Sequence, residues 1–256
     1  YNWRRSFKGR SIVWRWFHQW GSPKFFYHRS GALIPVLALA SGLILGAGVF
    51  WGLLIAPADY QQGESVRIMY VHVPAAILAQ SSYAMMAVMA LISLIWRLKI
   101  ADAAVQTVAP IGACITLLAL ATGSLWGKPM WGTYWVWDAR LTSTLILFFL
   151  FAGVLALRNA AGQSQTAGRA ASVLAVIGLL NLPIIKYSVD WWFTLHQPAS
   201  FTLTDRPAMP FSMWGPLLMM VVGFYAWFFL AWLIRLRHEL VKREVRSDWV
   251  QQMMKQ

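Results

Sequence analysis

Residues 31–58 read GALIPVLALASGLILGAGVFWGLLIAPA, a run without a single charged side chain. A helix of about 20 apolar residues crosses a hydrocarbon core about 30 Å thick, so this run is long enough to span a membrane. Five further charge-free or nearly charge-free runs follow it, at residues 68–96, 103–127, 141–157, 170–185 and 208–234. A backbone in lipid must satisfy its own hydrogen bonds, and these runs lack the alternation of barrel strands. The sequence therefore predicts an all-α integral membrane protein with six transmembrane helices.

The composition supports this fold class. Of the 256 residues, 59% are hydrophobic and only 12% are charged, compared with about 25% charged residues in soluble domains. The single cysteine, Cys114, lies inside an apolar run, which excludes a disulfide framework and a Cys-x-x-Cys-His site for covalent haem attachment. The first thirty residues are basic and aromatic, so we expect the first apolar run to remain as a span and not to be cleaved as a signal peptide.

The distribution of positive charge predicts the orientation. Of the 22 lysines and arginines, 17 lie on the side that would hold both termini and 5 on the other side. The positive-inside rule therefore places both termini in the cytoplasm. We expect a basic cytoplasmic segment at 1–30, a six-span membrane domain at 31–234 and a basic cytoplasmic tail at 235–256. Topology explains the net charge of +13, so no nucleic-acid partner is needed, and the basic tails are expected to attract anionic membrane lipid.

An outer loop at residues 126–140 concentrates aromatic side chains between glycines and a proline. It contains Trp126, Trp131, Trp135 and Trp137. Such rigid aromatic residues could form a platform for a large flat ligand. They could equally form an interfacial belt, because tryptophan and tyrosine collect at the surface of any membrane protein. Composition alone leaves both interpretations open.

Two of the five histidines, His72 and His196, fall at the same outer surface as this loop. Two neutral imidazoles on either side of an aromatic platform are what axial ligation of a haem iron requires. Each histidine could instead simply hydrogen-bond at the interface. The other three histidines lie in the basic tails, where a solvated side chain is the default.

Charged residues supply the third part of the candidate site. Arg67 and Arg140 are candidate contacts to the haem propionates, because a guanidinium binds carboxylates in a bidentate manner, and Lys128 is a third candidate through its positive charge. Asp138 could contact the ligand, or it could pair with Arg140 or Arg67 and orient the loop.

There is no phosphate-binding loop, since Pro129 follows Lys128. The sequence thus indicates no ATPase activity of its own.

Several motifs resemble those of one family, cytochrome c maturation protein C, also called Heme exporter protein C. The outer loop carries Trp-Gly-x-x-Trp at 131–135, Trp-x-Trp-Asp at 135–138 and Ala-Arg-Leu-Thr at 139–142. Further matching stretches occur in the same order at residues 56–63, 70–76, 109–112, 181–185 and 191–197. The resemblance covers the chain from the end of the first span to the third outer loop and leaves out the basic tails.

This resemblance implies a multi-pass protein of the bacterial inner membrane that acts in c-type cytochrome biogenesis. It implies that haem b is bound at the periplasmic surface by His72 and His196 and contacted by the tryptophan loop. The haem would then be delivered to a periplasmic haem chaperone, in a lyase-like role. The implied partners are that chaperone, the subunits of an ATP-binding cassette transporter and a small single-span membrane subunit.

Two other functions compete with this one. A b-type electron-transfer subunit usually needs histidine pairs at two depths of the membrane, and here the candidates lie at one depth. A haem transporter would move its cargo across the bilayer, but no ionisable residue lies clearly in the middle of a span to line a polar path.

Overall fold

A computed structural model describes residues 18–160, 164–196 and 208–255 of the chain. Within these residues, six helices are long and apolar enough to cross a membrane: Leu33–Ile55, Glu64–Trp96, Lys99–Trp131, Ala139–Ala160, Gln165–Trp191 and Phe211–Arg243. The prediction of an all-helical, multi-pass membrane protein is thereby confirmed. The predicted 1–30 segment falls largely outside the described residues.

The helices follow one another with short connections, except between residues 191 and 211. A short helix α2 (Pro23–Ser30) precedes α3 (Leu33–Phe50), which ends in a π-helical turn η2 (Trp51–Ile55). The 3-10 turn η3 (Glu64–Ile68) leads into α4 (Met69–Trp96) and then α5 (Lys99–Trp131). The remaining elements are α6 (Ala139–Ala160), α7 (Gln165–Ile177), η4 (Gly178–Leu180), α8 (Asn181–Trp191), α9 (Phe211–Arg243) and α10 (Asp248–Met253).

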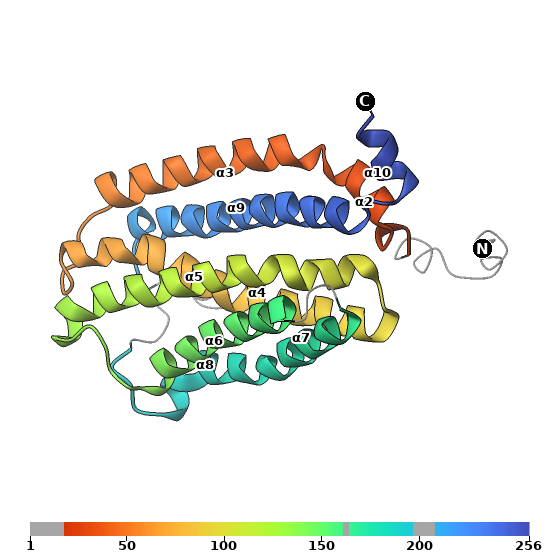
Figure 1. Ribbon diagram of the computed structural model, residues 1–256. Coiled ribbons are helices and arrows are strands. Elements are labelled where there is room, and N and C mark those ends of the chain that lie inside the picture. The colour runs from red at the N-terminus through yellow and green to blue at the C-terminus, as the bar shows by residue number, and fades with distance from the viewer. Residues whose placement is uncertain (1–17, 161–163, 197–207, 256) are drawn as a thin grey trace, which may run out of the picture.

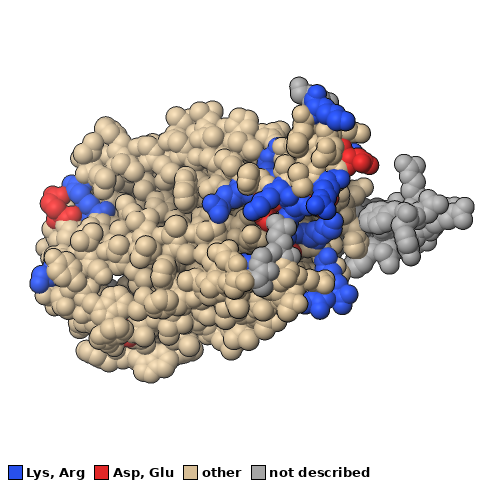
Figure 2. Space-filling model, viewed as in Figure 1, with Lys and Arg blue, Asp and Glu red and all other residues tan. Residues whose placement is uncertain are grey.

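The long helices form an elongated bundle (Figure 1). Helices α4 and α5 pack against each other, α3 packs against α9, and α6 packs against α5, α7 and α8. Helices α2 and α10 lie at the same end of the bundle (Figure 1). Lysine and arginine gather mainly at that end (Figure 2), which we call the basic end. The opposite end carries the predicted tryptophan loop, and we call it the tryptophan end.

Glycine allows close helix contacts in the core. A Cβ atom on Gly112 of α5 would lie 2.2 Å from Cζ of the fully buried Phe151 of α6. A Cβ atom on Gly178 would lie 1.9 Å from the hydroxyl oxygen of Tyr83 of α4. Membrane helices associate through such van der Waals packing, because lipid provides little hydrophobic force between them. These two glycines therefore fix how closely α6 and η4 approach the central pair.

The predicted ends of the tryptophan loop require a correction. Residues 126–131 do not belong to a loop, because α5 continues through Pro129 and ends at Trp131. The helix stops where Gly132 adopts a left-handed conformation (φ 78°) and its backbone N–H donates to the carbonyl of Lys128 at 3.0 Å. Glycine is favoured at this position after a helix because it has no Cβ to clash. The linker between α5 and α6 is thus residues 132–138.

The other spans also run beyond their apolar cores. The fifth begins at Gln165 and reaches Trp191, beyond the apolar run at 170–185, so the third outer connection starts at residue 192. Helix α9 continues to Arg243 because Leu236 and Leu240, beyond the apolar run, are buried. Arg237 packs over the ring of Tyr27 at 3.9 Å from its centroid. Amphipathic packing therefore extends helices where charge alone suggested an end.

Three charged side chains form a cluster at the basic end, which we call the Asp102 cluster. Arg158, whose side chain is only 6% exposed, donates from its two terminal nitrogens to the carboxylate of Asp102 at 2.9 and 2.5 Å. Arg243 donates to the same carboxylate at 2.6 Å. This one acidic residue therefore connects the beginning of α5 to the ends of α6 and α9.

We expect Asp102→Asn to lower the stability of the bundle. The substitution leaves the buried Arg158 without its carboxylate partner, whereas Arg243 keeps its ion pair with Glu239 at 2.6 Å. Breaking a buried pair costs about 3–5 kcal/mol, and the partial exposure of Asp102 should reduce the cost here to about 2 kcal/mol. The measurement is the thermal midpoint of the detergent-solubilised chain. Asp248→Asn, at an exposed position of α10, is the control and should change it much less; an equal effect of the two variants would contradict the assignment.

Candidate functional site

The predicted site residues all lie at the tryptophan end of the bundle, opposite α2 and α10 (Figure 1). His72 is in the first turn of α4, and His196 lies in the segment that follows α8. The others belong to η3, to the end of α5, to the 132–138 linker and to the start of α6, namely Arg67, Trp126, Lys128, Trp131, Trp135, Trp137, Asp138 and Arg140. Segments far apart in the sequence thus converge on one surface.

The two histidines face each other across a short gap. Their ring centroids are 6.5 Å apart and their planes are inclined by 37°. A metal ion lies about 2 Å from each ligating imidazole nitrogen, so an ion held between two imidazoles needs ring centroids roughly 6 Å apart. The spacing of this pair fits a metal centre between the two rings.

Hydrogen bonds fix the ring of His72. Its Nδ1 lies 3.0 Å from the carbonyl oxygen of Ala119 and 3.2 Å from the hydroxyl oxygen of Thr122. The Thr122 hydroxyl itself donates to the carbonyl of Leu118 at 2.7 Å. Because both neighbours of Nδ1 act as acceptors, Nδ1 carries the proton in the neutral ring and Nε2 carries the lone pair. A carbonyl that holds the other nitrogen of a ligating histidine is common in metal sites.

Gly123 of α5 provides the space for this ring. A Cβ atom at this position would lie 2.9 Å from Cε1 and 3.3 Å from Nδ1 of His72. Real Cβ atoms essentially never approach another atom so closely, and the ring would have to move. The absence of a side chain at residue 123 is therefore part of how the site positions His72.

His196 has different surroundings. Nη1 of Arg140 donates to Nδ1 of His196 at 3.2 Å, while its Nε donates to the hydroxyl of Ser188 at 3.1 Å. Its other terminal nitrogen donates to the carbonyl of Lys186 at 3.3 Å. An arginine can only donate, so Nδ1 of His196 is the acceptor. Arg140 thus fixes His196 against α8, and each of its three nitrogens has a protein acceptor.

Asp138 orients the segment that carries His196. Its Oδ1 accepts a hydrogen bond from the backbone N–H of Leu141 at 2.7 Å, which caps the N-terminus of α6. Its Oδ2 accepts a hydrogen bond from the Thr194 hydroxyl, and that hydroxyl oxygen accepts the backbone N–H of His196 at 3.1 Å. Asp138 forms no ion pair with Arg140 or Arg67 among the residues described.

The four tryptophans separate into two pairs. Trp126 lies edge-to-face with His72, with ring centroids 5.7 Å apart, and its indole N–H donates to Gln62 at 2.9 Å. Trp131 lies beside His196, with ring centroids 6.1 Å apart. These two indoles border the histidine pair, and we call the four rings the histidine–tryptophan cluster.

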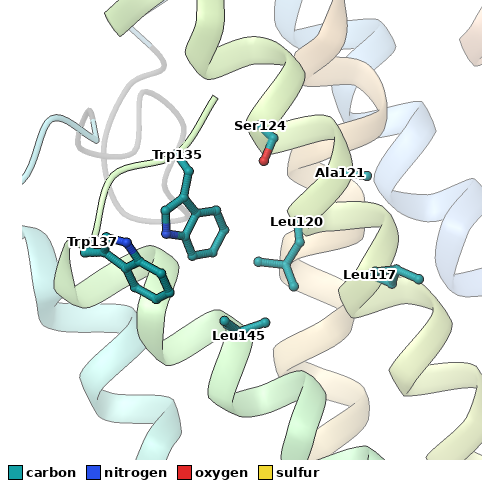
Figure 3. Close-up of a pocket in the computed structure, with 7 residues that line it drawn as sticks. All are labelled: Leu117, Leu120, Ala121, Ser124, Trp135, Trp137 and Leu145. Atoms are coloured by element: carbon teal, nitrogen blue, oxygen red, sulfur yellow. The ribbon is translucent and has the colours of Figure 1, made fainter. Parts of the chain in front are cut away.

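Trp135 and Trp137 lie elsewhere, 5.4 Å apart between ring centroids and roughly perpendicular. They line an apolar groove of about 420 Å³ with side chains of α5 and α6 (Figure 3), namely Leu117, Leu120, Ala121, Ser124 and Leu145. At 3.6 residues per turn, the α5 residues of this groove lie on the face opposite Ala119, Thr122 and Gly123. Helix α5 therefore separates the groove from His72.

The remaining two predicted contacts also have protein partners. Arg67 forms an ion pair with Glu64 and donates to the carbonyl of Gly52 at 3.1 Å. The ammonium group of Lys128 donates to the carbonyl of Gly132 at 2.9 Å and lies 5.3 Å from the ring centroid of Tyr134. Both cations stabilise the turns that surround the histidine–tryptophan cluster.

Comparison with known proteins identifies the family. The family model described as Heme exporter protein C matches residues 16–251. Heme exporter protein C of Escherichia coli strain K12 is 50% identical over 242 residues, which cover 94% of this chain and 98% of that protein. The chain belongs to the Heme exporter protein C family. The protein of the same name from Haemophilus influenzae is 47% identical over 238 residues, or 93% of this chain and 97% of that protein.

The similarity also reaches a mitochondrial protein. A putative cytochrome c biosynthesis protein of Marchantia polymorpha is 41% identical over 203 residues, which cover 79% of this chain and 86% of that protein. The match to the Heme exporter protein C family includes every residue of the histidine–tryptophan cluster and all six long helices. The family therefore confirms the resemblance inferred from the outer-surface motifs.

Two residues of the site that contact His72, Thr122 and Gly123, were not among the predicted site residues. Gln62 and Thr194 fall within the matching stretches 56–63 and 191–197, but no contact was predicted for either. A Thr-Gly pair one turn before Trp126, inside an otherwise apolar helix, was the available signal for Thr122 and Gly123. Gln62 and Thr194 lie in connections, where local sequence does not reveal a distant partner.

Proposed function

We propose that the chain binds haem b at its tryptophan end, on the periplasmic face of the inner membrane, and delivers it to a periplasmic haem chaperone for c-type cytochrome assembly. The observation that carries this proposal is the 6.5 Å spacing of the His72 and His196 rings, bordered by Trp126 and Trp131. Among the described residues, no group of three histidine, cysteine or acidic side chains could hold a metal ion. Two imidazoles suit a metal that already carries its other ligands, as haem iron does.

In this proposal each residue has one task. His72 and His196 would hold the haem iron, and the carbonyl of Ala119 keeps the proton of neutral His72 on Nδ1, so that Nε2 retains its lone pair. Arg140 and Asp138 hold the His196 segment in place. Trp126 and Trp131 contact the porphyrin, whereas Trp135 and Trp137 anchor the linker between α5 and α6. Haem supplies the reactive vinyl groups, and the protein contributes position and orientation.

The distribution of charge supports the proposed sidedness. Lysines and arginines gather at the basic end (Figure 2), and positively charged loops remain in the cytoplasm. The histidine–tryptophan cluster at the opposite end would then face the periplasm. The names of the bacterial relatives and the name of the Marchantia protein, which refers to cytochrome c biosynthesis, support haem handling in cytochrome c assembly. The sequence resemblance supports an ATP-binding cassette transporter and a small single-span subunit as partners.

Haem transfer from membrane vesicles tests the proposed direction of delivery. The purified chain is reconstituted in vesicles, haem is supplied either outside or inside, and a soluble apo-chaperone is added outside. We expect the chaperone to acquire haem only when haem is supplied outside vesicles in which the tryptophan end also faces outward, as determined by protease accessibility of that end. Acquisition of haem enclosed on the opposite side, without any other subunit, would support transport across the bilayer instead.

The two tryptophan pairs should respond differently to substitution. We expect Trp131→Ala to weaken haem binding about tenfold, because an aromatic contact contributes about 0.5–1.5 kcal/mol beyond its buried area. Trp137→Ala, whose side chain is 78% exposed, is the matched control and should bind haem with nearly unchanged affinity. Absorbance titration of the detergent-solubilised variants measures both. A larger loss in Trp137→Ala than in Trp131→Ala would place the porphyrin at the groove that Trp135 and Trp137 line.

A further inference from the structure

A second cavity lies at the basic end of the bundle, far from the histidine–tryptophan cluster. Its volume is about 400 Å³, within the range of about 300–1,000 Å³ that small-molecule sites occupy. It is bordered by the junction of α4 and α5, the end of α6, the start of α7 and the end of α9. No part of the proposed haem function uses this cavity.

Positive side chains outnumber negative ones on the wall of this cavity. Five cations line it, namely Arg97, Lys99, Arg158, Arg169 and Arg243. The only carboxylates among the described residues that line it are Asp102 and Glu244. The cavity wall therefore carries an excess of positive charge.

The ion pairs leave two of these cations uncompensated. Asp102 is shared by Arg158 and Arg243, and Glu244 binds Lys99 at 2.8 Å. Neither Arg97 nor Arg169 has a carboxylate within 4 Å among the residues described. Both side chains are exposed at the cavity. They can bind an external anion without breaking an existing ion pair.

Two further features favour a phosphate group in particular. The first turn of α7 borders the cavity through Ser164, Gln165 and Gly168, and the N-terminus of a helix attracts phosphate through its backbone N–H groups and dipole. Leu94, Leu98 and Leu240 form an apolar part of the same wall. A phospholipid combines an anionic phosphate with apolar chains, and basic pockets between membrane helices bind such headgroups on the cytoplasmic side.

We propose that this cavity binds the phosphate group of an anionic ligand, with a phospholipid headgroup of the adjacent leaflet as the favoured source. Arg97 and Arg169 contact the phosphate, while the Asp102 cluster holds the surrounding helix ends in place. The bound group lowers the excess positive charge at the point where the ends of α4, α6 and α9 meet. Free phosphate shares this chemistry and is the alternative source.

Lipid titration of the full-length chain in detergent tests the proposal by native mass spectrometry. Phosphatidylglycerol, phosphatidylcholine and inorganic phosphate are the probes. We expect phosphatidylglycerol to bind at least about tenfold more tightly than phosphatidylcholine, and the Arg97→Gln, Arg169→Gln double variant to lose about tenfold or more of that affinity. If inorganic phosphate displaces phosphatidylglycerol, the cavity is still an anion site, but its ligand is a soluble phosphate compound. Equal affinities for phosphatidylglycerol and phosphatidylcholine, with no binding of inorganic phosphate, would contradict the proposal.

Two further variants distinguish binding in the cavity from general attraction of lipid to the positively charged surface. Lys242→Gln removes one positive charge from an exposed position of α9 that does not line the cavity, and it should change the affinity less than about twofold. Glu244→Gln removes a carboxylate from the wall and releases Lys99, so it should tighten binding, which a folding defect would not do. An equal loss in Lys242→Gln and the double variant, or weaker binding by Glu244→Gln, contradicts the proposal.

Discussion

A chain that carries both His72→Ala and His196→Ala is expected to purify without haem, whereas the unsubstituted chain is expected to take up haem with the absorption spectrum of a bis-histidine complex. The two rings lie 6.5 Å apart between centroids, and alanine offers no ligand in place of either. Neither histidine belongs to a buried hydrophobic cluster, so the helices should still form. Absorbance of the detergent-solubilised variant, with circular dichroism to confirm helix content, provides the measurement.

The control for this experiment is His238→Ala, at an exposed position of the basic end, which should leave the haem spectrum unchanged. The single variants add a graded result. His72 has its Nδ1 proton fixed by a carbonyl, while Nδ1 of His196 accepts from Arg140. His72 is therefore the better prepared ligand, and its loss should weaken haem binding more. An unaltered bis-histidine spectrum in the double variant would exclude these residues as the ligands.

The fold was largely predictable because the membrane constrains it so strongly. A long run without charge has one stable solution in lipid, a helix that satisfies its own backbone. The ends of the helices were less predictable. Gly127 and Gly132 both follow a tryptophan, but only Gly132 adopts a left-handed conformation. Gly127 stays helical beneath Trp131, whose ring lies 2.9 Å from the place of an added Cβ.

The candidate site was predictable in its residue types but not in its arrangement. Topology placed His72, His196 and the four tryptophans at one end. Which tryptophans border the histidines depends on where α5 ends and on the path of the linker that follows it. The correct end of α5 is needed to see that Trp126 and Trp131 are helical, and the sequence motif alone treats all four alike. The shared contacts of Arg140 and Asp138 with the His196 segment depend on packing between distant residues, which no local pattern encodes.

Substitution of Gly123 provides a test that removes no ligand. We expect Gly123→Ala to weaken haem binding about 10- to 100-fold, the range found when the outer contacts of metal ligands are disturbed. The new Cβ would lie 2.9 Å from Cε1 of His72, so the ring must rotate and lose its hydrogen bond to Ala119. Alanine is better than glycine in a helix by about 1 kcal/mol. The haem-free variant should therefore be as stable as the unsubstituted chain or more so.

Opposite effects on haem affinity and on stability distinguish this mechanism from a folding defect. Gly46→Ala is the matched control, because an added Cβ there meets nothing within 4 Å. It should gain the same helix propensity and retain full haem binding. Absorbance titration gives the affinity, and the thermal midpoint without haem gives the stability. If Gly123→Ala binds haem like the unsubstituted chain, the ring of His72 does not need its position against α5, and the proposed preorganisation of the ligand is wrong. If Gly123→Ala and Gly46→Ala weaken haem binding equally, the loss comes from replacing a helical glycine in general. The steric contact with His72 would then not be its cause.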